Sequence, residues 1–137
     1  MKLVGNIGKP ALQFLSGQTP EDIFVFELSS FQLENLQQSP HVAVFLNLHS
    51  EHLNHHGNFA AYAKAKANIT LHQNPTDFLI YNANNKEVAK IARKSKAQKI
   101  PFKRKVMEKN ISFLAATEPV VLAGKLFGIS ERKIKQA

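Results

Sequence analysis

Short apolar runs of strand length alternate along this chain with segments of helical spacing, and this alternation limits the possible folds most strongly. The clearest runs are Ile-Phe-Val-Phe at residues 23–26 and Val-Ala-Val-Phe-Leu at residues 42–46. Continuous apolar runs of this length are typical of strands covered on both faces. A third strand is predicted at residues 77–81. Residues 99–102 suit an edge strand, because Pro101 cannot donate a ladder hydrogen bond.

Helical segments separate these predicted strands. We predict them at residues 10–16, 31–36, 59–71 and 86–95. Near the C-terminus, Thr117 is predicted to cap a helix that has Pro119 in its first turn, and Ser130 is expected to begin another. Strands that alternate with helices indicate an α/β fold, with a mostly parallel sheet flanked by helices. Residues 1–137 are long enough for one such domain with a buried core.

The composition excludes several classes of protein. No apolar run reaches the roughly 18 residues that a spanning helix needs, so no membrane association is expected. The first residues are too short and too interrupted for a secretory signal, and a cytoplasmic location is expected. The absence of cysteine excludes disulfides and thiolate chemistry.

Positive charge is concentrated in one part of the chain. The net charge is +8, and ten of the 18 basic residues lie between residues 86 and 109. Such a cluster suits either a nucleic-acid-binding patch or a solvated helix face with its following loop. It lacks the interleaved aromatic residues of a single-strand binder, so we favour the solvated face and expect no nucleic-acid partner. A non-catalytic basic binding module remains the alternative from another class.

Three segments resemble motifs of one enzyme family in their order and approximate spacing. They are Val4-Gly5-Asn6-Ile7-Gly8, Glu27-Leu28-Ser29-Ser30-Phe31-Gln32-Leu33-Glu34, and residues 46–57 followed by Tyr62 and Ala65-Lys66-Ala67. The family is that of the Mur ligases, the ATP-dependent ligases of peptidoglycan precursors. The resemblance is close over residues 4–85 and weaker over residues 122–137. It implies that residues 1–137 form part of the family's central domain, which is P-loop NTPase-like.

The resemblance also implies an activity. The run that begins at Glu27 is most similar to family members that add D-glutamate to UDP-N-acetylmuramoyl-L-alanine. These two compounds would be the substrates of a complete, monomeric enzyme, with ATP and two Mg²⁺ ions as cofactors. A relative of folylpolyglutamate synthase is the alternative, although Phe31 and Gln32 argue against it. The family's Walker loop and its N-terminal and C-terminal domains are not found in residues 1–137, so we expect no turnover from this segment alone.

Glu27 and His52 are the first two candidate site residues. A carboxylate at the end of a buried strand is well placed for Mg²⁺, which prefers oxygen ligands, although a salt-bridged or capping carboxylate is the alternative. His52 lies in a cluster of five histidines between residues 41 and 56, whose spacing fits a zinc site poorly. The resemblance selects His52 as a catalytic residue beside the metal or the acyl phosphate. The remaining histidines are expected at the surface or in packing: His41, His49, His55, His56 and His72.

Lys66 is the third candidate. Within the predicted helix at residues 59–71 it shares a face with Phe59 and Tyr62, whereas Lys64 points elsewhere. Burial disfavours a lysine ammonium, and a neutral amine reacts with CO₂. The resemblance implies that Lys66 is carbamylated, which makes it both a catalytic residue and a metal ligand. A snorkelling lysine with its amine in water is the alternative.

Three further residues are candidates for substrate binding. Asn6 and Ser30 match positions where the family contacts the nucleotide sugar or the phosphates, and Gly5 lets the backbone approach a ligand closely. The sequence also departs from the family pattern. Glu51 and Asn54 replace two aspartates beside His52, and a His-Asn pair expected in residues 111–121 is not recognisable. We expect the three metal-site candidates to meet at the carboxyl-terminal edge of the sheet.

Overall fold

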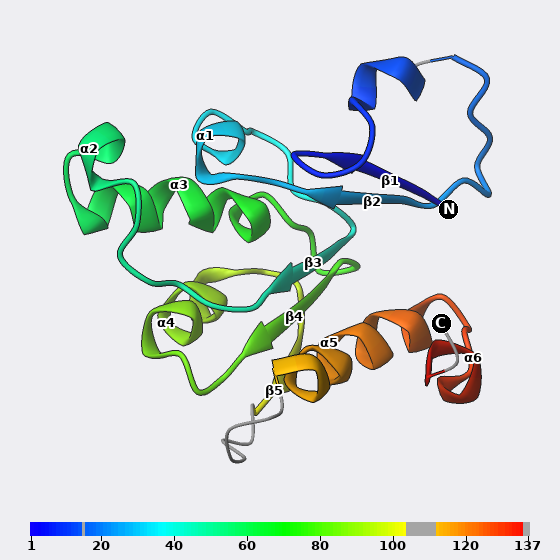
Figure 1. The fold of residues 1–137 in the computed structure, drawn as a ribbon. Helices are drawn as coiled ribbons and strands as arrows, with labels where there is room; N and C mark the ends of the chain where they lie inside the picture. Colours follow the sequence, from blue (N-terminus) through cyan, green and yellow to red (C-terminus); the bar gives the residue numbers. More distant parts are fainter. Residues whose placement is uncertain (15, 104–111, 136–137) are drawn as a thin grey trace.

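Parallel strands with helices packed beside them form the fold (Figure 1). The computed structural model describes residues 1–14, 16–103 and 112–135. The strands are β1 Lys2–Gly5, β2 Phe24–Glu27, β3 Val42–Phe45, β4 Phe78–Asn82 and β5 Gln98–Phe102. The helices are η1 Ala11–Phe14, α1 Ser30–Leu33, α2 Leu53–His56, α3 Phe59–Leu71, α4 Lys86–Lys94, α5 Ser112–Leu126 and α6 Glu131–Lys135. The predicted α/β class is confirmed.

The strands form two parallel sheets within the described part of the chain. One sheet pairs β1 with β2, and the other has the order β3-β4-β5. The predicted strand that ends at Glu27 is present as β2, but the prediction that it is buried is wrong, since Val25 and Phe26 are 43% and 48% exposed. The reason is that β2 pairs only with β1 here and has little packed against its faces. β5 pairs only with β4, which confirms the edge position predicted from Pro101.

The core lies around the three-stranded sheet. Leu79 and Ile80 of β4 are fully buried, which fits their place in the central strand. Leu79 belongs to a cluster with Phe45, Tyr62 and Val88. Helices α3 and α4 pack beside the sheet and against each other, and α5 contacts all three of its strands (Figure 1). These helices fix the segments that carry the candidate site residues.

Helix α3 has the bounds that its periodicity predicts. It begins after Asn58, whose side chain accepts a hydrogen bond of 2.9 Å from the amide of Ala61. Its buried surface is wider than predicted, because Ala65 and Ala67 are buried as well as Tyr62. The helix contacts α1 and α2 in addition to β3 and α4, so more than one of its sides is covered.

Two helix predictions need correction. The last long helix begins at Ser112 and not after Thr117, so Pro119 lies inside it. Leucine and alanine are frequent in residues 112–117 and favour helix strongly enough to extend it past the proline. The segment after Pro10 forms the single 3-10 turn η1 instead of a longer helix. Among the described residues, no helix is both long and apolar enough to cross a bilayer.

Candidate functional site

The ends of β1 and β2 hold Gly5 against Glu27. The two residues are paired in the parallel register, and the amide of Asn6 donates a hydrogen bond of 2.9 Å to the Glu27 carbonyl. Gly5 has φ +107°, and a side chain there would collide with that carbonyl oxygen. Only glycine fits this turn. The Glu27 backbone is therefore fixed by the first of the three motif segments.

One oxygen of the Glu27 carboxylate, Oε2, is buried without a hydrogen-bond partner among the described residues. A buried carboxylate oxygen without a donor or a cation is costly, so this atom is suited to receive one. Oxygen is also the ligand type that Mg²⁺ prefers. This environment is compatible with a metal role for Glu27, which stays a prediction.

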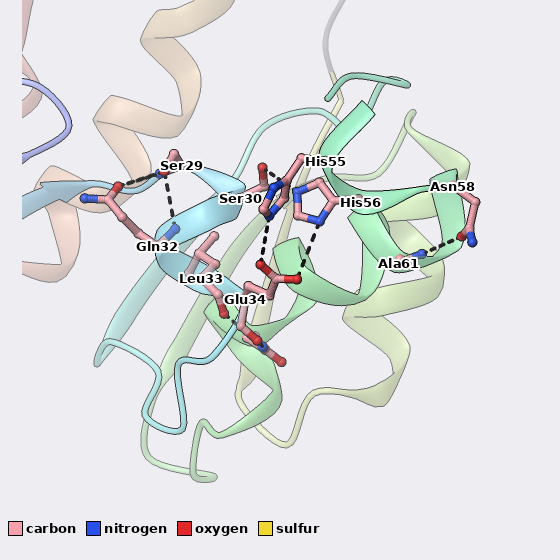
Figure 2. Close-up of polar contacts among 10 residues, drawn as sticks. Ser29, Ser30, Gln32, Leu33, Glu34, His55, His56, Asn58 and Ala61 are labelled. Carbon is pink, nitrogen blue, oxygen red and sulfur yellow. Dashed lines mark hydrogen bonds and ion pairs between the residues drawn. The ribbon is translucent and has the colours of Figure 1, made fainter. Parts of the chain in front are cut away.

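Helix α1 begins shortly after Glu27, and a capping box stabilises its N-terminus. Ser29 and Gln32 form it: the Gln32 side chain accepts from the Ser29 amide at 2.9 Å, and the Ser29 hydroxyl caps the Gln32 amide (Figure 2). The next residue, Ser30, is buried, and its hydroxyl lies 3.1 Å from Nε2 of His56. Ser30 was predicted to contact substrate, and the structure gives it a partner within the protein.

His52 adopts an unusual backbone conformation. Its φ is 51°, and among the described residues it is the only non-glycine residue with a positive φ. Its ring makes an edge contact with Phe31, at 5.1 Å between ring centroids. Histidine tolerates this conformation only at some cost, and such strain is often found at functional sites. His52 itself is exposed, and it lies at the N-cap of α2 beside α1.

Lys66 lies in the middle of α3 and is partly buried, whereas Lys64 is exposed, as the periodicity predicts. One turn before Lys66, Tyr62 packs against the ring of His56, with 5.6 Å between ring centroids. Burial raises the pKa of Tyr62, and the carboxylate of Glu51 adds to this rise. Helical side chains lean towards the N-terminus of their helix, so the Lys66 stem leans towards the turn that carries Tyr62.

Helix α1 is linked to all three segments that carry the metal-site candidates. It follows Glu27, its Phe31 contacts His52, and it is hydrogen-bonded to α3 through Asn68. Glu27 and His52 were expected to meet at the edge of one sheet. In the described residues, β2 and β3 belong to separate sheets and are not paired. That Glu27, His52 and Lys66 act at one pocket stays a prediction.

Sequence reasoning missed several residues that shape this region. Phe31 and Asn68 connect the elements, and Glu34 approaches the side chains of His55 and His56. These contacts join residues far apart in the chain, so no local spacing signals them. The histidine cluster at residues 41–56 drew attention to His56 as a possible ligand. Its burial could not be predicted, because it depends on how α1 packs against α2 and α3.

The fold is an α/β domain with parallel strands, and open α/β proteins bind their ligands beyond the carboxyl ends of such strands. A family model described as "Mur ligase middle domain" matches residues 5–125. The chain belongs to the Mur ligase family.

Curated relatives carry one common name, "UDP-N-acetylmuramoylalanine--D-glutamate ligase". The relative from Lacticaseibacillus casei (strain BL23) is 45% identical over 76% of this chain and 23% of its own length. A relative from Lactiplantibacillus plantarum is 39% identical, over 79% of this chain and 24% of its own length. One from Oceanobacillus iheyensis is 43% identical, over 74% and 23% respectively. The chain therefore spans about a quarter of the length of the curated relatives that it matches.

Proposed function

We propose that this chain is the central-domain segment of a cytoplasmic, ATP-dependent ligase that joins D-glutamate to UDP-N-acetylmuramoyl-L-alanine. The names of the relatives support this substrate pair, and so does the run from Glu27 to Leu33. The observation that carries the proposal is the buried, unpartnered Oε2 of Glu27 at the carboxyl end of β2. This oxygen could bind a cation, and an ATP-dependent ligase needs Mg²⁺ to offset the charge of the phosphates.

In this proposal, Glu27, His52 and Lys66 would hold Mg²⁺. The ion supplies compensation for phosphate charge when ATP and the acyl phosphate are bound. Glu27 offers a carboxylate oxygen, and Lys66 offers carbamate oxygens after its amine has reacted with CO₂. His52 is exposed and held at a fixed angle by its backbone and by Phe31, which suits a contact to a charged ligand.

Substrate binding is assigned to Gly5, Asn6 and Ser30. The side chain of Asn6 is exposed, while its amide is used to hold Glu27. The absence of a side chain at Gly5 keeps the strand ends close. The hydroxyl of Ser30 has one donor and two acceptor positions, so it can accept from His56 and still donate to an anionic substrate group.

A chimera tests the proposal. This chain would replace the matching segment of the Lacticaseibacillus casei relative, and circular dichroism would confirm that the product folds. Phosphate release from ATP is then measured with UDP-N-acetylmuramoyl-L-alanine and D-glutamate, and product mass is checked. We expect release that requires both substrates and falls at least about 100-fold in Glu27→Gln.

The same assay separates the alternative ligase class. Folate with L-glutamate is offered in place of the nucleotide substrate and D-glutamate. If a folded chimera releases phosphate only with this second pair, the chain belongs to a relative of folylpolyglutamate synthase instead. A folded chimera that binds the nucleotide substrate but releases no phosphate with either pair contradicts any ligase role for the segment.

A further inference from the structure

A second cluster of potential metal ligands lies beside α1. Glu34 at the end of α1 faces His55 and His56 in the last turn of α2 (Figure 2). Nε2 of His55 is 3.2 Å from Oε2 of Glu34, and Nδ1 of His56 is 3.9 Å from Oε1 of the same carboxylate. One ligand atom from each of the three residues can be chosen so that all lie within 4.8 Å of one another.

The buried imidazole of His56 points to a missing ligand. Its side chain is 1% exposed, and its Nδ1 atom has no hydrogen-bond partner in the described part of the chain. The other ring nitrogen, Nε2, lies 3.1 Å from the hydroxyl of Ser30. If Nε2 carries the proton and donates it to Ser30, the lone pair of Nδ1 faces the Glu34 carboxylate. A cation between these two electron-rich atoms would stabilise both of them.

We propose that Glu34, His55 and His56 bind a divalent late first-row transition metal ion of the zinc type. Two imidazole nitrogens and one carboxylate oxygen form a ligand set that suits Zn²⁺ far better than Mg²⁺. Ser30 acts as the outer partner that fixes the tautomer and orientation of His56, as is usual for metal-binding histidines. The side chains of Glu34 and His55 are 43% and 45% exposed, which leaves room for a water or a substrate group as fourth ligand.

The two exposed ligands must move closer to His56 to close a tetrahedral site. Ligand atoms around a tetrahedral Zn²⁺ lie about 3.3 Å apart, given metal–ligand bonds of about 2.0–2.1 Å. Nε2 of His55 and Oε2 of Glu34 are already 3.2 Å apart, whereas Nδ1 of His56 lies 3.9 Å from the other carboxylate oxygen and the three ligand atoms span up to 4.8 Å, so this set must contract. Glu34 and His55 are exposed enough to make that movement. His56, the buried ligand, stays in place.

This site differs from the one proposed at Glu27. Its donors are mainly nitrogen, and the residues come from the ends of α1 and α2 instead of a strand end. Phe31 packs against the rings of both His55 and His56, at 4.5 and 5.6 Å, and it also contacts His52. The cluster was not expected from sequence, because adjacent histidines have poor zinc spacing and Glu34 lies 21 residues before His55.

Equilibrium dialysis of the full chain against Zn²⁺ alone tests the proposal. We expect one Zn²⁺ per chain with a dissociation constant in the micromolar range or below, and no competition from millimolar Mg²⁺. Glu34→Gln and His55→Ala, which change exposed side chains, should each weaken binding by about 10-fold or more. His72→Ala removes an exposed histidine elsewhere and should leave the affinity unchanged.

Nitrogen chemical shifts of the histidine rings provide the second readout. Zn²⁺ should shift Nδ1 of His56 and leave its Nε2 protonated towards Ser30. Parent-like affinity in both Glu34→Gln and His55→Ala would overturn the proposal, because binding would then come from scattered surface histidines. Binding weaker than millimolar would also overturn it, since the three side chains would then not form a Zn²⁺ site.

Discussion

The side-chain amide of Asn68 donates a hydrogen bond of 2.9 Å to the backbone carbonyl of Leu33. The same amide also donates to the carbonyl of Glu34, at 3.0 Å. Carbonyls at a helix end lack partners within the helix, so Asn68, in the last turn of α3, helps to satisfy the end of α1 together with the Leu36 amide. The helix that carries Lys66 is thereby attached to the helix that follows Glu27.

Replacing Asn68 by alanine should lower the free energy of unfolding by about 1 kcal/mol, because the part-buried Leu33 carbonyl keeps only its bond from the Leu36 amide and the exposed Glu34 carbonyl loses Asn68. Urea unfolding followed by circular dichroism measures the change. Lys64→Ala, at an exposed position of the same helix, should change it by less than about 0.5 kcal/mol. Equal effects of the two variants would show that Asn68 does not hold α3 to α1.

His52 offers a test that separates backbone strain from chemistry. Both His52→Gly and His52→Ala remove the ring, but glycine adopts the observed φ of 51° without strain. The glycine variant should therefore be more stable than the alanine variant by about 1 kcal/mol, measured by urea unfolding. In the chimera, both should lose turnover if the imidazole is needed. A fully active glycine variant would remove His52 from the proposed site.

Asp77 should make stability depend on pH. Hydrogen bonds from the Asn74 amide and the His41 ring hold the pKa of Asp77 below its ordinary value, against a smaller opposing effect of burial. Since the folded pKa is depressed, this stabilisation is present above the unfolded pKa of about 3.9 and is lost as the pH falls through the folded value.

Asp77→Asn keeps the shape of the side chain and removes its charge. Its urea midpoint should lie below that of the parent chain at pH 5 to 7. The two midpoints should approach each other as the pH falls below about 4. A difference that stays constant down to pH 2 would show that the carboxylate charge is not what stabilises this turn.

The basic face of α4 is predicted not to be a nucleic-acid site. Arg93 and Lys94 are exposed in the last turn of α4, where positive charge complements the helix dipole, and Lys90 pairs with Glu87 at 2.7 Å. Residues 104–109, which complete the basic cluster, lie outside the described residues. Retention on DNA at physiological salt should be negligible. Micromolar binding that is lost in the double variant Arg93→Gln, Lys94→Gln would contradict this prediction.

Local signals in the sequence were sufficient for most of the elements. The bounds of α3 followed from its periodicity, and the edge position of β5 followed from Pro101. The start of α5 was misjudged, because a proline signal was weighted above the helix formers before it. The split between the two sheets was not predictable, since it depends on which strands pair and not on any single run.

For the candidate site, the sequence supplied only the strand-end position of Glu27. Its metal role stays a prediction, and the buried, unpartnered oxygen is compatible with it. The partner of Ser30 and the approach of Glu34 to His56 were not predictable. Both contacts arise when α1 and α2 pack together, and they join residues more than 20 positions apart.

A double-mutant cycle in the chimera tests the central claim, that Glu27 and Lys66 serve one site. Phosphate release is measured for Glu27→Gln, Lys66→Ala and the double variant, with Lys64→Ala as the control on the same helix. If both residues hold the same ion, each single change should lower kcat about 100-fold, and the double variant should be hardly worse than either. The control should stay within about twofold of the parent. Losses that multiply in the double variant, or a Lys66→Ala variant as active as Lys64→Ala, would contradict the claim.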